Sequence, residues 1–188
     1  MKIMGIDTSA TAASVSICED GHVLSEFFVN VKLTHSQTMM PMVKAALDCA
    51  RLSLQEIDVF AVSNGPGSFT GLRIGISAVK GMAFALEKPC IGISTLEAIA
   101  RNALSIPGIL CPVMDARVKQ VYNALFESDG QQMNRLCPDR AVTIAELFEE
   151  LQSFDRPVVL VGDGVELCAR EFAGKLPQAV LVQPNIRY

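Results

Sequence analysis

Asp7 is the first residue whose type and position could serve catalysis. It follows the apolar segment 2–6 and precedes a polar stretch at 8–11. An aspartate at the end of a strand can orient Mg²⁺, and the turn after it can bind phosphate through backbone N–H groups. Such binding favours a glycine at the point of closest approach, because a Cβ hinders the ligand. No glycine lies between Asp7 and Cys18, so the sequence favours an aspartate that caps its own turn.

A glycine-rich stretch at 63–75 is the second candidate for phosphate binding. It lies between two apolar segments, an order typical of a strand, a turn and a helix. A P-loop would have Lys and then Ser or Thr after its last glycine, where this chain has Leu72 and Arg73, and the dinucleotide fingerprint also fails. The stretch is therefore more consistent with a structural turn, in which either Ser68 or Thr70 caps the helix. The turn residues are Gly65, Pro66, Gly67, Ser68 and Thr70.

The two histidines do not suggest a metal site or an activated nucleophile. His35 would need a second ligand one helical turn later, but that position is Met39. His22 falls in a predicted hairpin turn, so no triad-like set can be assembled for nucleophilic catalysis. Asp115 and Arg117 are expected to form a local ion pair. The sequence therefore predicts no catalytic residue, no metal and no cofactor.

The helix predicted at 69–86 is apolar around most of its circumference, which indicates burial on most sides. Only a narrow polar stripe remains, at Arg73, Ser77 and Lys80. The face with larger residues can cover a sheet. The face with small residues lets another helix approach closely, either from this chain or from a second subunit. This small face consists of Gly71, Gly75, Ala78, Met82 and Ala85.

A second helix is predicted to start near Thr38 and to run to about Arg51, since Pro41 is tolerated in a first turn. Its methionines suit an adaptable contact surface, and an ordinary core face explains them equally well. Met39, Val43, Ala46 and Ala50 line one face, with Met40 and Leu47 beside it.

The composition indicates a large interface with a partner. Half of the 188 residues are hydrophobic and the mean hydropathy is +0.34, yet no apolar run reaches the roughly 18 residues of a membrane span. The net charge of −4 and the lack of a Lys/Arg cluster argue against nucleic-acid binding by this chain alone. Six scattered cysteines without a C-x-x-C pair, and an N-terminus unlike a signal peptide, predict a cytoplasmic protein.

The order of predicted elements indicates a duplicated α/β fold. Three strands, a helix, a strand and a further helix are predicted in succession within residues 1–106, and a smaller strand-rich unit occupies residues 107–188. Both units begin with an apolar strand that ends on an aspartate, Asp7 in one and Asp115 in the other. This organisation is that of the actin, Hsp70 and hexokinase (ASKHA) fold, so we expect two subdomains with a mixed sheet in each.

Five short motifs follow one another along the chain. The most specific is Gly-Pro-Gly-Ser-Phe-Thr-Gly-Leu-Arg-Ile-Gly at 65–75. The others are Ile-Asp-Thr-Ser at 6–9, Thr-His-Ser at 34–36 with Pro41-Met42, Met-Asp-Ala-Arg at 114–117 and Val-Gly-Asp-Gly at 161–164. Over essentially the whole chain the pattern resembles the TsaB (YeaZ) family of bacterial tRNA threonylcarbamoyladenosine biosynthesis. Members of that family usually continue into a further helical segment, so the second subdomain is expected to be incomplete.

The resemblance implies a scaffold rather than a catalyst. TsaB-like proteins heterodimerise with TsaD, the paralogue that transfers threonylcarbamoyl to the adenosine beside the tRNA anticodon, and they form homodimers in isolation. The ATPase TsaE is then a partner through the complex, and tRNA is contacted only indirectly. Met39 replaces one of the paired metal-binding histidines of TsaD, which also argues against an older glycoprotease label. The expected partner interface comprises Met39, Met40, Val43, Ala46, Gly71, Gly75, Ala78 and Met82.

This interface leads to a test by substitution. Ala78→Glu or Gly75→Arg should abolish partner binding without unfolding the monomer, whereas unfolding would assign the small face to the chain's own core. Two other functions remain as alternatives. A stand-alone ATP-binding enzyme of the actin-like fold would favour a glycine in the first hairpin, and a metallopeptidase would bind a metal.

Overall fold

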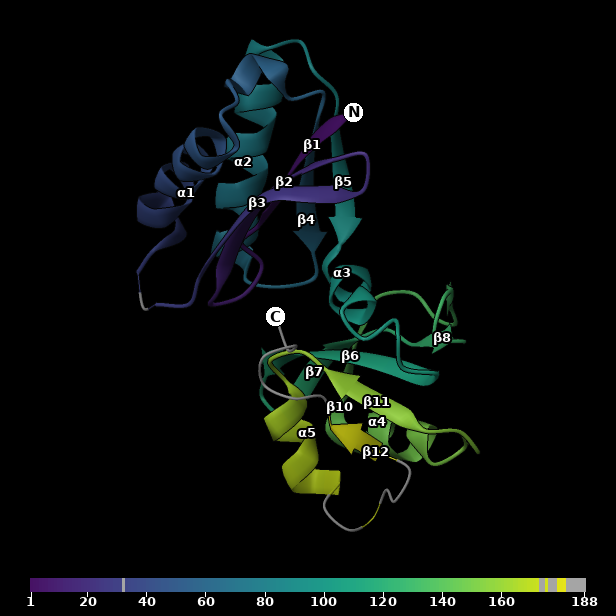
Figure 1. Cartoon of the computed structure of the whole chain (residues 1–188). Coiled ribbons are helices and arrows are strands. Elements are labelled where there is room, and N and C mark those ends of the chain that lie inside the picture. The colour runs from purple at the N-terminus through teal and green to yellow at the C-terminus, as the bar shows by residue number, and fades with distance from the viewer. Residues whose placement is uncertain (32, 173–174, 176–178, 182–188) are drawn as a thin grey trace. The chain divides into compact units, whose positions relative to one another are not determined.

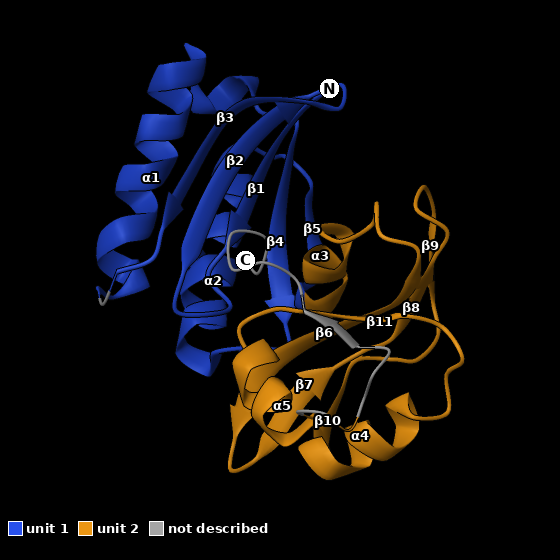
Figure 2. Ribbon diagram, turned by 60° about the horizontal axis from the view of Figure 1, so that its bottom comes forward, with its two compact units in different colours: residues 1–95 blue, residues 96–188 orange. Residues whose placement is uncertain are grey.

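The computed structural model describes residues 1–31, 33–172, 175 and 179–181. Contacts divide the chain into two compact units, residues 1–95 and 96–188 (Figure 2). The sequence, in contrast, suggests a boundary after residue 106. The two units are described separately below.

The helix α3 (Thr95–Arg101) and the segment after it account for this difference. The carbonyl of Leu104 accepts a hydrogen bond from Ser128 Oγ (2.7 Å). Glu97 forms an ion pair with Arg135 (3.2 Å). Both partners belong to the strand-rich part of the second unit, so this segment is bonded to the second unit rather than ending the first.

The first unit contains a five-stranded mixed sheet in the order β3-β2-β1-β4-β5 (Figure 1). The central strand β1 is antiparallel to β2 and parallel to β4, and β5 is parallel to β4. Alternate residues of a strand face the same side, so Met4, Ile6 and Phe60 are buried together. The strands are β1 (Lys2–Asp7), β2 (Ala13–Glu19), β3 (His22–Val29), β4 (Val59–Gly65) and β5 (Cys90–Ser94).

Two helices lie side by side over one face of this sheet (Figure 1). The first, α1 (His35–Ala50), packs on β2 and β3, and the second, α2 (Phe69–Ala85), packs on β4. A short 3₁₀ helix, η1 (Leu54–Glu56), connects α1 to β4. The prediction that α1 starts near Thr38 is wrong, because it starts at His35 and so contains Pro41. Pro41 is exposed, so water can hydrate the carbonyl that lacks an N–H partner there.

The second unit contains a seven-stranded sheet. Strands β10, β7, β6, β11 and β12 are adjacent in that order, β8 pairs with β6, and β9 pairs with β8. The helices α4 (Ile144–Leu151) and α5 (Val165–Phe172) contribute apolar residues to its core. Within the described part of the chain, no helix combines the length and the apolar character of a membrane span. The strands are β6 (Gly108–Arg117), β7 (Gln120–Asn123), β8 (Phe126–Ser128), β9 (Met133–Arg135), β10 (Arg140–Thr143), β11 (Val158–Val161) and β12 (Ala179–Leu181).

The two units share a local arrangement around an aspartate. Asp7 ends β1, and its Oδ1 accepts the backbone N–H of Ser9 (2.6 Å). Asp115 lies near the end of β6, and its Oδ1 accepts the backbone N–H of Arg117 (2.7 Å). Each of these strands pairs with an antiparallel strand that follows it and with a parallel strand from later in its unit. This correspondence confirms a duplicated α/β fold with two mixed sheets.

Candidate functional site

The carboxylate of Asp7 is used within the first unit. Its Oδ1 accepts the N–H of Ser9, and its Oδ2 accepts the hydroxyl of Ser63 at 2.7 Å. Thr8 and Ser9 are 0% and 2% exposed. Asp7 therefore caps the turn that follows it and connects that turn to the end of β4.

The glycine turn before α2 packs directly on the Asp7 turn. The N–H of Ser68 donates to the Ser9 carbonyl (2.6 Å), and a Cβ added to Gly67 would overlap the same carbonyl. Gly65 and Gly67 have φ angles of +120° and +157°, where glycine is favoured. Pro66, between them, follows a cis peptide bond. The glycines thus let the two turns approach closely.

Ser68, and not Thr70, caps the N-terminus of α2. Ser68 precedes the helix, and its Oγ accepts the N–H of Gly71 at 3.3 Å. Thr70, the other candidate cap, lies within α2.

The turn after Asp7 uses its polar groups for contacts within the first unit. Both oxygens of Asp7 already accept hydrogen bonds, and the carbonyl of Ser9 is covered by the glycine turn. The hydroxyl of Thr8 donates to the Gly71 carbonyl (2.8 Å), which holds the turn under the start of α2. These polar groups of the turn therefore hold the first unit together.

His35 is engaged in a backbone contact and does not assemble a metal site. Its Nε2 lies 2.8 Å from the carbonyl oxygen of Ala10. Met39, one turn later, is 3% exposed and belongs to the core. Among the described residues, no group of three or more His, Cys, Asp and Glu side chains could hold a metal ion. These residues therefore do not fit a metal centre.

The second unit brings together two aspartates that sequence reasoning did not connect. The backbone N–H of Asp115 donates to Asp163 Oδ1 (3.2 Å). Desolvation raises the pKa of Asp163, the nearby charge of Asp115 raises it further, and the hydrogen bond from Asp115 opposes this shift. The predicted ion pair of Asp115 with Arg117 is wrong, because the contact is the backbone hydrogen bond described above. The signal for the aspartate pair was available, since both residues follow apolar strands.

Six of the eight predicted interface residues are buried within the first unit, among them Gly71, Gly75 and Met82 of the small face of α2. The physical reason is Thr8, because a Cβ added to Gly71 would overlap its carbonyl and one added to Gly75 would overlap its hydroxyl. On α1, the carbonyl of Ala46 accepts a hydrogen bond from Ser25 Oγ of β3 (2.9 Å). The six buried residues are Met39, Val43, Ala46, Gly71, Gly75 and Met82.

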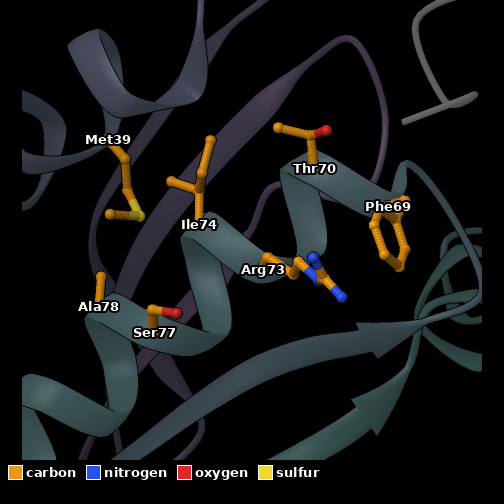
Figure 3. A pocket seen from close by; sticks show the side chains of 7 residues that line it. All are labelled: Met39, Phe69, Thr70, Arg73, Ile74, Ser77 and Ala78. Atoms are coloured by element: carbon orange, nitrogen blue, oxygen red, sulfur yellow. The ribbon is translucent and has the colours of Figure 1, made fainter.

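A groove lies on the surface next to these buried residues. A groove of about 630 Å³ runs along α2 and reaches Met39 of α1 (Figure 3). We call it the α1–α2 groove. Ala78, one of the two predicted interface residues that are not fully buried, lines it, and the other, Met40, is 47% exposed on α1. The groove is lined by Met39, Phe69, Thr70, Arg73, Ile74, Ser77 and Ala78.

The outer side of α2 carries an aromatic residue at each end. Phe69 is 69% exposed and Phe84 is 88% exposed, values that are unusual for phenylalanine. Between them lie Ser77 and Gly81, and a Cβ added to Gly81 would meet no atom within 4 Å. The exposed side of α2 therefore combines apolar anchors with small residues that leave space.

Comparison with solved structures defines the class of the fold. The chain is similar to a protein from Bacteroides thetaiotaomicron with an actin-like ATPase fold and unknown function, at 13% identity and a TM-score of 0.52 over 97% of this chain and 91% of that one. YeaZ from Pseudomonas aeruginosa has 27% identity and a TM-score of 0.78, over 97% of this chain and 84% of that one. The protein thus has the duplicated actin-like fold that its sequence predicts.

Sequence comparison then identifies the family within this fold. The model of the TsaD family, described as tRNA N6-adenosine threonylcarbamoyltransferase, matches residues 23–183. The tRNA threonylcarbamoyladenosine biosynthesis protein TsaB of Bacillus subtilis (strain 168) is 34% identical over 167 residues, which cover 89% of this chain and 73% of that protein. The chain belongs to the TsaB family, and the resemblance drawn from its motifs is confirmed.

Proposed function

We propose that this chain is a non-catalytic subunit of the complex that installs threonylcarbamoyl on the adenosine beside the anticodon of tRNAs. It acts by forming a heterodimer with TsaD, the catalytic paralogue. The relative from Bacillus subtilis is named for tRNA threonylcarbamoyladenosine biosynthesis, and the TsaD family model matches most of this chain. Both observations support a place in this tRNA modification.

The side chains of the first unit support an accessory role rather than catalysis. The most suggestive acid, Asp7, holds a turn together, and the half-buried His35 contacts a backbone carbonyl. A general acid or base must reach the atom whose proton it transfers. Neither of these residues is free to do so without breaking a contact that maintains the fold.

The exposed face of α2 is the observation that carries the proposal. Burial of a phenylalanine side chain contributes about 1.5–3 kcal/mol, and α2 leaves both Phe69 and Phe84 largely in water. The α1–α2 groove is lined by Phe69 and offers a mainly apolar concave surface. A partner helix placed along α2 would bury these residues, and Gly81 leaves room for its backbone.

The remaining partners follow from this arrangement. TsaE joins through the complex, and tRNA is bound mainly by the other subunits, in keeping with the net charge of −4 on this chain. In isolation the chain forms a homodimer. The alternative function, a stand-alone ATP-binding enzyme of the actin-like fold, is disfavoured because the first hairpin lacks a glycine and both oxygens of Asp7 accept hydrogen bonds within the chain.

An omission assay tests the proposal. Threonylcarbamoyl transfer to tRNA is measured with the cognate TsaD and its other partners, in the presence and absence of this chain. We expect transfer only when the chain is present, and no transfer by the chain alone. Full transfer without the chain would overturn the proposal, and ATP binding by the isolated chain would then be assayed.

A further inference from the structure

We propose that Arg73 is the docking point for a carboxylate on the facing helix of the partner, and that this contact selects a partner with an acidic helix over a second copy of this chain. The inference rests on the proposed function, because it concerns the same groove, and it adds the chemistry by which the partner is recognised.

Arg73 is held in a defined position at the α1–α2 groove. The central carbon of its guanidinium lies 3.8 Å from the centre of the Phe69 ring. Both side chains line the groove (Figure 3). A cation stacked on a ring uses the face of the guanidinium, whereas its N–H donors point outward within the plane. A contact of this kind holds the guanidinium against the ring while leaving its donors available for a carboxylate.

No carboxylate of the described residues neutralises this guanidinium. The ion pairs formed within the described parts of the chain do not include Arg73. On the neighbouring helix, Lys44 is paired with Asp48 (2.6 Å), so it adds no net charge. An unpaired arginine that contacts the exposed ring of Phe69 has the features of a binding hot spot. Because planar donors match a carboxylate in a bidentate way, an Asp or Glu side chain is the ligand that fits.

The charge of α2 distinguishes an acidic partner from a second copy. The helix contains Arg73 and Lys80 and no Asp or Glu, although the whole chain has a net charge of −4. A symmetric dimer through this helix would bring the cations of both copies together, because the same surface is used twice. Like charges placed opposite each other disfavour association, whereas an acidic helix gains affinity. The groove thus fits a paralogue with acidic residues on its facing helix.

Binding measurements on purified proteins test this inference. The affinity of the cognate TsaD is measured by calorimetry for the wild-type chain and for Arg73→Gln, Arg73→Lys and Arg73→Glu. We expect Arg73→Gln to weaken binding by about tenfold or more, Arg73→Glu to weaken it further, and Arg73→Lys to fall between the wild type and Arg73→Gln. Wild-type affinity should also decrease as ionic strength rises.

Two controls accompany the series. Lys175→Glu makes the same charge change as Arg73→Glu at an exposed position of the second unit, and it should leave binding unchanged. Thermal unfolding should show that all variants fold, because the side chain of Arg73 is exposed. Sedimentation of the chain alone should show that Arg73→Gln does not weaken self-association.

The outcomes separate this inference from the proposed function. If Phe84→Glu weakens TsaD binding while all three Arg73 variants bind like the wild type, the exposed side of α2 is the interface and the carboxylate contact is refuted. If Arg73→Gln weakens self-association as much as it weakens TsaD binding, the selection against a second copy is refuted. If the wild-type chain does not bind TsaD at all, the proposed function fails and this inference fails with it.

Discussion

The hydroxyl of Thr8 lies in the space that a Cβ on Gly75 would need. Thr8 is fully buried, and its hydroxyl donates to the carbonyl of Gly71, one turn earlier in α2. The small residues of α2 therefore pack against the turn that follows β1 in the same chain. This relationship revises one expectation from the sequence, because Gly75→Arg should unfold the monomer instead of sparing it.

A pair of alanine substitutions on one helix tests this assignment. Gly75→Ala should lower the free energy of unfolding by about 1–3 kcal/mol, because the added methyl group overpacks the contact with Thr8. Gly81→Ala should instead raise it by roughly 0.5–1 kcal/mol, since the position is open and alanine favours a helix. Urea unfolding of both variants provides the measurement. Equal effects at the two positions would show that Thr8 does not occupy the space beside Gly75.

A substitution at Gly81, the exposed glycine of α2, is expected to change stability and binding in opposite directions. Gly81→Gln should stabilise the isolated chain, as Gly81→Ala does, and should weaken binding to TsaD because its side chain fills the space left for the partner. Calorimetric titration with TsaD, next to urea unfolding, measures both effects. A variant with wild-type affinity would place the partner away from this part of α2.

The sequence predicts the fold well because aspartates and glycines at recognisable positions mark the ends of several strands. Asp7 and Asp115 close apolar segments at corresponding places, and the glycine stretch predicts the turn from β4 to α2. Helical periodicity also shows that Gly71 and Gly75 share a face. It does not show what packs on that face, because the contact with Thr8 joins positions far apart in the chain.

The interface predicted from the sequence leaves out the exposed Phe69 and Phe84, although a signal for them is present. Phe69 and Phe84 lie at the two ends of the polar stripe formed by Arg73, Ser77 and Lys80. Successive residues of this set are three or four positions apart, so they share one side of the helix. Aromatic residues on a polar stripe are unusual and indicate a contact surface. The hydrophobicity of the helix as a whole concealed this, because nearly every other face is apolar as well.

The hydrogen bonds of Asp7 lead to a second stability prediction. Asp7→Ala should lower the free energy of unfolding by about 1–3 kcal/mol, because it leaves the N–H of Ser9 and the hydroxyl of Ser63 without their partner. Asp20→Ala is the control, since the side chain of Asp20 forms an exposed pair with the N-terminus worth about 0–1 kcal/mol, and alanine tolerates the φ angle of 49° at this position only a little less well than aspartate. Denaturant unfolding compares the two. A larger loss for Asp20→Ala would contradict the structural role of Asp7.

Asp163 gives a prediction for the dependence of stability on pH. Its pKa in the folded chain is raised above the ordinary value of 3.8, mainly by desolvation. A raised pKa means that the folded state holds the proton more tightly, so the stabilisation is present below pH 3.8 and is lost as the pH rises through the folded value. The stability of the wild type relative to Asp163→Asn should therefore fall from acidic to neutral pH.

Asp129 is the matched control because its pKa shifts in the opposite direction. Backbone N–H groups of Gln132 and Gln131 lower it, so its stabilisation is present above pH 3.8 and is lost as the pH falls. The advantage of the wild type over Asp129→Asn should thus grow toward neutral pH. Unfolding of both variants across this range tests the signs, and parallel curves for the two would contradict the assignment.

A titration of the modification reaction tests the central claim most directly. Threonylcarbamoyl transfer to tRNA is measured with TsaD and its other partners at increasing concentrations of the wild-type chain or of Phe84→Glu, with Val118→Glu as an equally exposed control in the second unit. We predict that Phe84→Glu reaches the wild-type maximal rate at a much higher concentration, whereas Val118→Glu matches the wild type throughout. Identical curves for the wild type and Phe84→Glu, or transfer by the chain without TsaD, would contradict an activator that docks through α2.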